Sequence, residues 1–258
     1  MGCRLTVTVV LVLLSVGSTA SEDSAVKQND LAELVRHLMD VQVGFTQMVP
    51  PGMSIEAKEI SREGKSGDNL VVQYHIFVKG APSDALFQEI QWPVTADKPS
   101  AALEGIAIGK DGILMCAGRT PEQCGDAKKL DDRIEFITMP RKGEPTRLAF
   151  VSPKIKIGTV IVPDPVEAHD KGCSLSAVRL TQKFELAFLS GSGYPANTDV
   201  HYRVSSEMTT EFIIKSDSSG NIRVSVIPYP GKKSSGRVTV KITETKCSPE
   251  VSYEWGKL

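Results

Sequence analysis

The chain has 258 residues, of which 41% are hydrophobic and 24% are charged, with 30 Lys and Arg against 31 Asp and Glu. This composition excludes an intrinsically disordered chain, and a formal net charge of −1 offers no electrostatic attraction to nucleic acid. The length is sufficient for two domains of about 100 residues each.

The first twenty residues have the features of a secretory signal peptide. Arg4 supplies a positive charge, the apolar run 5–16 follows, and Ser18-Thr19-Ala20 forms a small-residue cleavage site. The run is shorter than the roughly 20 apolar residues that are needed to cross a bilayer. We therefore expect cleavage near Ala20, no transmembrane segment in the mature chain, and a secreted or periplasmic protein.

Four cysteines follow the expected cleavage site: Cys116, Cys124, Cys173 and Cys247. An even number in an oxidising compartment predicts two disulfides, for which three pairings exist. We favour Cys116 with Cys124, which bracket a short turn-rich loop, and Cys173 with Cys247, which lie at the two ends of the second domain predicted below. The seven residues between Cys116 and Cys124 do not match the spacing of a zinc site, so no metal is expected.

The first structural element of the mature chain is predicted to be a short amphipathic helix over 31–42. Five apolar residues recur there at helical spacing: Leu31, Leu34, Val35, Leu38 and Met39. Gly44 and Pro50-Pro51-Gly52 are expected to end the helix. Residues 21–52 are thus predicted to be an N-terminal helix and lead-in, with the apolar stripe packed on the chain's own domain.

Between residues 53 and 163 the pattern changes to short β-type runs separated by Gly, Pro and Asp clusters. The clearest run is 69–78, in which alternate residues are apolar. Seven further strands are expected, at 54–61, 86–92, 103–108, 113–116, 134–139, 147–151 and 158–162. Asp111-Gly112 predicts a hairpin turn between two of them. The segment is therefore predicted to form a first β-sandwich domain.

Residues 164–172 are polar and start no periodic pattern, so we interpret them as a linker. Seven strands are expected after it, at 174–180, 184–188, 200–204, 208–215, 222–226, 238–242 and 251–255. Seven alternating strands in about 85 residues are typical of an immunoglobulin-like sandwich. The predicted fold class is all-β, with two β-sandwich domains, of which the second, 173–258, is immunoglobulin-like. Because Cys173 opens its first strand and Cys247 precedes its last, the disulfide is expected to act as a terminal staple.

One turn of the second domain carries a family resemblance. Gly191-Ser192-Gly193-Tyr194, followed by Pro195 and a strand, resembles the G-x-G-[FY] turn of many exported bacterial immunoglobulin-like modules, with the proline one residue early. Four further segments make the chain similar to exported bacterial proteins of unknown function: Gln91-Trp92-Pro93, Cys116-Ala117-Gly118, Lys142-Gly143-Glu144-Pro145 and Tyr253-Glu254-Trp255-Gly256. The resemblance implies an exported sandwich and carries no activity with it.

No motif predicts catalysis or a cofactor. The serines of 190–193 lack the glycine spacing of a hydrolase elbow, and 231–236 lacks the spaced first glycine of a phosphate loop. The densest set of metal-ligand residue types is Glu167, His169, Asp170 and Cys173. Because the expected disulfide would occupy Cys173, no metal is predicted there. His75 and His201 fall on the strand faces opposite their apolar neighbours.

Aromatic rings are the remaining candidates for binding. Tyr229, held between two prolines at a loop tip, and Trp92, at a strand end, are the predicted partner-binding residues, whereas Tyr253 and Trp255 share the inward phase of the last strand. We predict an exported, noncatalytic β-sandwich protein that serves as a binding or structural module for an envelope or extracellular protein or glycan. The alternatives are a hydrolase-type enzyme with its site at the domain junction and a periplasmic chaperone-like protein that donates or accepts a strand.

Overall fold

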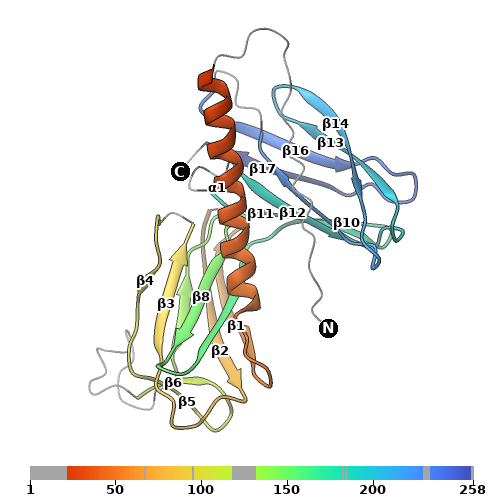
Figure 1. Cartoon of the computed structure of the whole chain (residues 1–258). Helices are drawn as coiled ribbons and strands as arrows, with labels where there is room; N and C mark the ends of the chain where they lie inside the picture. Colours follow the sequence, from red (N-terminus) through yellow and green to blue (C-terminus); the bar gives the residue numbers. More distant parts are fainter. Residues whose placement is uncertain are drawn as a thin grey trace. The chain divides into compact units, whose positions relative to one another are not determined.

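The computed structural model describes residues 22–66, 68–94, 96–117, 132–181, 183, 185–228 and 233–256. The expected signal peptide, Cys124 and Tyr229 lie outside these residues. Contacts divide the chain into two compact units, of which unit 1 comprises residues 1–39 and 165–258 and unit 2 comprises residues 40–164. Antiparallel strands make up most of the described chain, with α1 as its one helix (Figure 1), so the all-β class is confirmed.

Helix α1 (Glu22–Gln47) is longer at both ends than the predicted 31–42. Gly44 does not end it, because the residue is exposed and has no positive φ, and a single exposed glycine lowers helix stability by only about 1 kcal/mol. The helix ends three residues before Pro50-Pro51. Proline disfavours a helical conformation in the residue before it and donates no backbone hydrogen bond. Residues up to Met39 belong to unit 1, and the last turns belong to unit 2.

The described residues of unit 1 form two four-stranded antiparallel sheets. One sheet has the order β10 (Val166–Asp170), β11 (Cys173–Arg179), β12 (Ala187–Ser192), β15 (Ile222–Val226). The other has the order β14 (Thr209–Lys215), β13 (Asp199–Ser205), β16 (Gly236–Ile242), β17 (Glu250–Trp255). Inward side chains from both sheets, such as Leu189 and Val240, share one core with Tyr253 and Trp255. Six of the seven strands expected after residue 172 lie close to their predicted bounds, and the one expected at 184–188 begins only at Ala187 and runs to Ser192.

The linker prediction for 164–172 is wrong, because this stretch contains strand β10. It pairs with β11 through a hairpin that turns at Lys171 and Gly172, both of which have positive φ. The strand has only two apolar inward residues, Val166 and Ala168, and its other residues, Glu167, His169 and Asp170, are polar. Two apolar positions are too few for a strand pattern to be evident in the sequence.

The disulfide between Cys173 and Cys247 is present as predicted. It joins the first residue of β11 to the loop before β17, and the two cysteines are 5% and 3% exposed. Their Cα atoms are 6.1 Å apart, which is an ordinary separation for a disulfide. The bond therefore closes a loop that spans nearly the whole of the sandwich.

Part of α1 covers the outer face of the first sheet of unit 1. Val35 and Met39 pack against Leu180 and Leu186, and Val178 and Phe188 lie at the margin of this cluster. Leu186 and Phe188, in the segment predicted as a strand at 184–188, thus lie on the face under α1, whereas Ala187 and Leu189 face the sandwich core. The helix contributes an apolar layer outside the sandwich, which covers Leu186 and part of Phe188 at the start of β12.

Unit 2 is also built from antiparallel sheets in its described part. One sheet has the order β1 (Ser54–Lys65), β2 (Asp68–Lys79), β7 (Glu135–Thr138), and another β4 (Ser100–Ala101), β3 (Gln88–Pro93), β8 (Thr146–Val151), β9 (Lys156–Ile161). The predicted Asp111-Gly112 turn joins β5 (Ile106–Ile108) to β6 (Leu114–Cys116). The inward residues of β2 and β8 share one core. The eight strands expected in this segment are present, and the ninth, the two-residue β4, was not expected.

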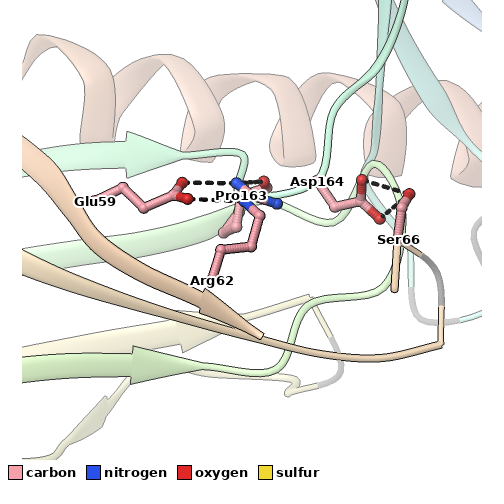
Figure 2. Close-up of polar contacts among 5 residues, drawn as sticks. All are labelled: Glu59, Arg62, Ser66, Pro163 and Asp164. Carbon is pink, nitrogen blue, oxygen red and sulfur yellow. Dashed lines mark hydrogen bonds and ion pairs between the residues drawn. The ribbon is translucent and has the colours of Figure 1, made fainter. Parts of the chain in front are cut away.

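Polar contacts hold the end of unit 2 against its first hairpin (Figure 2). Arg62 donates to the Glu59 carboxylate at 2.6 and 2.8 Å and to the Pro163 carbonyl oxygen at 2.9 Å. Ser66 Oγ donates to the Asp164 carboxylate at 2.8 Å. The hydrogen bond between Arg62 and Glu59 lowers the pKa of the glutamate and raises that of the arginine. Because the Arg62 and Glu59 side chains are exposed, their ion pair contributes little to the stability of the fold. We infer that the cluster instead positions residues 163–164.

Candidate functional site

Four serines lie side by side on the outer face of the β10-β11-β12-β15 sheet, and we call them the serine shelf: Ser174, Ser176, Ser190 and Ser192. Ser174 on β11 is in register with Ser192 on β12, and Ser176 is in register with Ser190. The two Oγ atoms of each pair are 2.9 Å apart. Because opposite residues of an antiparallel pair share a face, the four hydroxyls form one polar surface.

The serine shelf lines an open depression of about 210 Å³, to which Arg223 on β15 and Asn221, the residue before β15, also contribute. Val178 and Phe188 occupy the next outward positions along β11 and β12, and there the face becomes apolar and meets α1. The same sheet face thus changes from apolar under the helix to polar at the shelf. Serine side chains are short, so a ligand can approach the sheet closely.

Charged groups flank the serine shelf on both sides. On β10, Glu167 is opposite Ser176 and His169 is opposite Ser174, and both side chains are exposed. On β15, Arg223 is opposite Ser190. One row across the four strands therefore presents a carboxylate, two hydroxyls and a guanidinium. The row offers hydrogen-bond donors and acceptors with opposite charges at its two ends.

Tyr194 supports the serine shelf from inside the sandwich. The ring is 4% exposed, and its hydroxyl donates to the Ser174 carbonyl oxygen at 2.9 Å. Burial raises the pKa of Tyr194 to about 12, so the hydroxyl keeps its proton at physiological pH. Gly220 has φ +73°, and a Cβ there would collide with the Tyr194 carbonyl oxygen. Glycine is therefore required where this turn passes Tyr194.

The predicted binding residue Trp92 makes its contacts within unit 2. Its Nε1 donates to the Ala96 carbonyl oxygen at 3.0 Å, and its ring meets Phe45 edge-on with 6.3 Å between ring centroids. The buried Arg147 guanidinium lies 5.9 Å from the ring centroid, and its Nε donates to Gln42 Oε1. The partner-binding role of Trp92 stays a prediction, as does that of Tyr229, which lies outside the described residues.

The predicted cysteine and metal-ligand residues separate into different roles. Cys116 is buried and disulfide-bonded, and its expected partner Cys124 lies outside the described residues. Cys173 is bonded to Cys247, and Asp170 Oδ2 accepts a hydrogen bond from the Ser248 amide at 2.7 Å. In the described ranges, no three His, Cys, Asp or Glu side chains are grouped so that they could hold a metal ion. None of the described helical residues forms a segment long and apolar enough to span a membrane.

A buried carboxylate in unit 2 was not anticipated from the sequence. Glu89 on β3 is 2% exposed and is in register with the core residue Phe150. Its Oε1 accepts a hydrogen bond from Gln91 Nε2 at 2.8 Å. Desolvation raises its pKa, and the Gln91 hydrogen bond offsets only part of this effect. The ionised form is therefore unfavourable in the folded state.

Replacing this carboxylate by its neutral amide, Glu89→Gln, is expected to stabilise the protein at pH 7 by about 1 kcal/mol. The unfolded chain ionises Glu89 near the ordinary value of 4.5, whereas the folded chain does so at higher pH. Ionisation of Glu89 therefore costs the wild-type protein no stability below pH 4.5. The cost grows as the pH rises from 4.5 toward the raised pKa of the folded state. Urea unfolding of both proteins between pH 4 and pH 8 checks this. A constant difference across this range would contradict it.

Comparisons with known proteins identify no family. No family model matches the chain, and no curated protein matches it. Among solved structures, the chain is similar to the native conformation of E. coli alpha-2-macroglobulin, with 11% sequence identity and a TM-score of 0.21. The match covers 82% of this chain and 16% of that one. A likeness this weak carries no argument about fold or function.

Proposed function

We propose that the chain is an exported, noncatalytic binding module that recognises a glycan on the serine shelf. The shelf carries the proposal, because four neighbouring outward strand positions hold the smallest hydroxyl side chain. The Ser174–Ser192 pair uses one proton in its mutual hydrogen bond and keeps one O–H donor, whereas Ser176 Oγ also donates to the Ser190 carbonyl oxygen at 3.2 Å, so the second pair offers acceptor lone pairs. Glu167 and Arg223 add an acceptor and a donor at the ends of the row. An uncharged polyhydroxyl ligand complements this set.

Strand pairing supports an immunoglobulin-like sandwich for the second domain. Counted from β11, the second strand pairs with the fifth, since β12 pairs with β15, and the third pairs with the sixth, since β13 pairs with β16. These are the B–E and C–F pairings of that fold. The disulfide supports export, because such bonds persist in oxidising compartments. Sandwiches of this type commonly serve as binding modules on exported proteins.

Valine substitutions on the serine shelf test the proposal. Ser176→Val with Ser190→Val replaces two central hydroxyls by larger apolar side chains, and is expected to weaken glycan binding at least tenfold, or about 1.4 kcal/mol. The matched control is Thr239→Val with Ser252→Val, which removes a hydroxyl pair of 2.7 Å from the β16–β17 face. A glycan array identifies the ligand, and calorimetric titration measures the affinity of both variants for it.

Two outcomes would contradict this assignment. Equal loss of affinity in the shelf variant and the control would mean that the shelf does not contact the ligand. In the second outcome, the wild-type protein binds no glycan on the array but captures an envelope protein, and the shelf variant fails to capture it. The serine shelf would then be the binding surface, and its partner would be a protein rather than a glycan.

A further inference from the structure

Strand β14 is an edge of the second sheet of unit 1, and among the described residues it pairs only with β13. Its register with β13 runs from Thr209 to Lys215 without a shift. Edge strands are usually protected from further pairing by a proline, a bulge, an inward charge or charged side chains, above all lysine. Strand β14 has no proline, bulge or inward charge, its outward Lys215 shares a face with Glu211, and Ile213 on that face is 54% exposed. The edge is therefore suited to pair with another strand.

The outward residues of β14 are self-complementary. Glu211, Ile213 and Lys215 alternate along one face, with the isoleucine midway between opposite charges. If a second copy of β14 is placed antiparallel about a two-fold axis at Ile213, Glu211 of each copy lies opposite Lys215 of the other. Opposite charges placed directly across an antiparallel pair stabilise it, and the two isoleucines meet on the axis.

The neighbouring strand extends this charge pattern. Arg203 on β13 donates to Glu211 at 2.6 and 3.1 Å, and Asp199 is in register with Lys215. Across two copies, the row Arg203, Glu211, Lys215, Asp199 alternates in sign, with the first two residues from one copy and the last two from the other. Each dimer would contain this row twice, because the axis is two-fold.

The opposite edge of the same sheet lacks this complementarity. The outward residues of β17 are Glu250, Ser252 and Glu254. Antiparallel pairing of two such strands about Ser252 would place Glu250 of one copy against Glu254 of the other. Like charges directly opposite are destabilising. The two edges therefore differ in their fitness for self-pairing, although both have alternating outward side chains.

We propose that β14 pairs with β14 of a second copy of this chain, about a two-fold axis at Ile213. The two four-stranded sheets then join into one sheet of eight strands. Backbone hydrogen bonds supply the attraction, and the Glu211 and Lys215 pairs set the register. This self-association uses a different surface from the serine shelf and does not depend on glycan binding.

Cysteine cross-linking tests the axis. In the proposed dimer, the two Ile213 Cα atoms are about 4.5 to 5.5 Å apart, within the reach of a disulfide. The two Thr209 Cα atoms are eight residues of strand apart, or roughly 27 Å. Under mild oxidation, Ile213→Cys is expected to form a covalent dimer on nonreducing electrophoresis, and Thr209→Cys, on the same face of the same strand, is expected to remain monomeric. Equal cross-linking of the two variants, or none in either, would overturn the proposal.

Charge exchange tests the register. Lys215→Glu places Glu against Glu211 of its copy, and Glu211→Lys places Lys against Lys215, so each variant alone is expected to dimerise at least about tenfold more weakly than wild type in sedimentation velocity. A mixture of the two variants restores both opposite-charge pairs and is expected to recover the heterodimer. Unchanged melting temperatures would show that both variants are folded. If the mixture dimerises no more strongly than either variant alone, the proposed register is wrong.

Discussion

Replacing both Cys173 and Cys247 by alanine is expected to lower the free energy of unfolding of unit 1 by about 4 to 5 kcal/mol. The bond spans 74 residues of sequence. In the chain-entropy model, opening a loop of this length returns about 4.5 kcal/mol of conformational freedom to the unfolded chain at 25 °C. Both cysteines are buried in the sandwich core, so the lost sulfur atoms add a smaller packing penalty. This loss is a large fraction of the stability of an ordinary domain.

Urea unfolding followed by the fluorescence of Trp255 measures this loss. A Trp92→Phe background leaves Trp255 as the one tryptophan in the chain, and that residue lies in the same core as the disulfide. The control in this background is Thr239→Val with Ser252→Val, which alters exposed hydroxyls and leaves the core intact. A decrease below about 1 kcal/mol in the cysteine variant would mean that the unfolded chain is already restricted without the bond.

The strands could be predicted because their inward faces bury apolar residues at every second position. The run from Leu70 to Val78 has this pattern without interruption, and it forms β2. Strand β10 was missed because its inward face has only two apolar residues, Val166 and Ala168, and its pairing depends on the neighbouring strand rather than on its own composition. The end of α1 was missed because Gly44 is exposed in the helix, where its cost is small.

The candidate site was harder to predict because it depends on which strands are neighbours. The alternating serines at 174 and 176 and at 190 and 192 are evident in the sequence. Their meaning requires the register of β11 with β12, which places the pairs together, and the position of α1, which leaves this part of the face uncovered. The charge symmetry of β14 likewise becomes informative only when the strand is known to be an edge.

Truncation of Tyr194 to alanine is expected to lower the free energy of unfolding of unit 1 by about 3 to 5 kcal/mol, because it leaves a cavity the size of an aromatic ring. The ring is buried in the sandwich core, and its backbone amide donates to the Gly220 carbonyl oxygen at 3.1 Å. Tyr194→Phe keeps the ring and removes only the hydrogen bond to Ser174, so its expected loss is about 1 kcal/mol.

The two variants separate packing from positioning. Because the Tyr194 hydroxyl holds the backbone of Ser174, Tyr194→Phe is expected to weaken glycan binding on the serine shelf about two- to fivefold, with a loss of only about 1 kcal/mol in the free energy of unfolding. The matched control is Tyr202→Phe, whose ring belongs to the same core but whose strand, β13, lies in the other sheet. Urea unfolding and calorimetric titration check the two effects. If Tyr194→Phe and Tyr202→Phe bind the glycan equally, the shelf backbone is held by the strand register alone, and Tyr194 serves only the core.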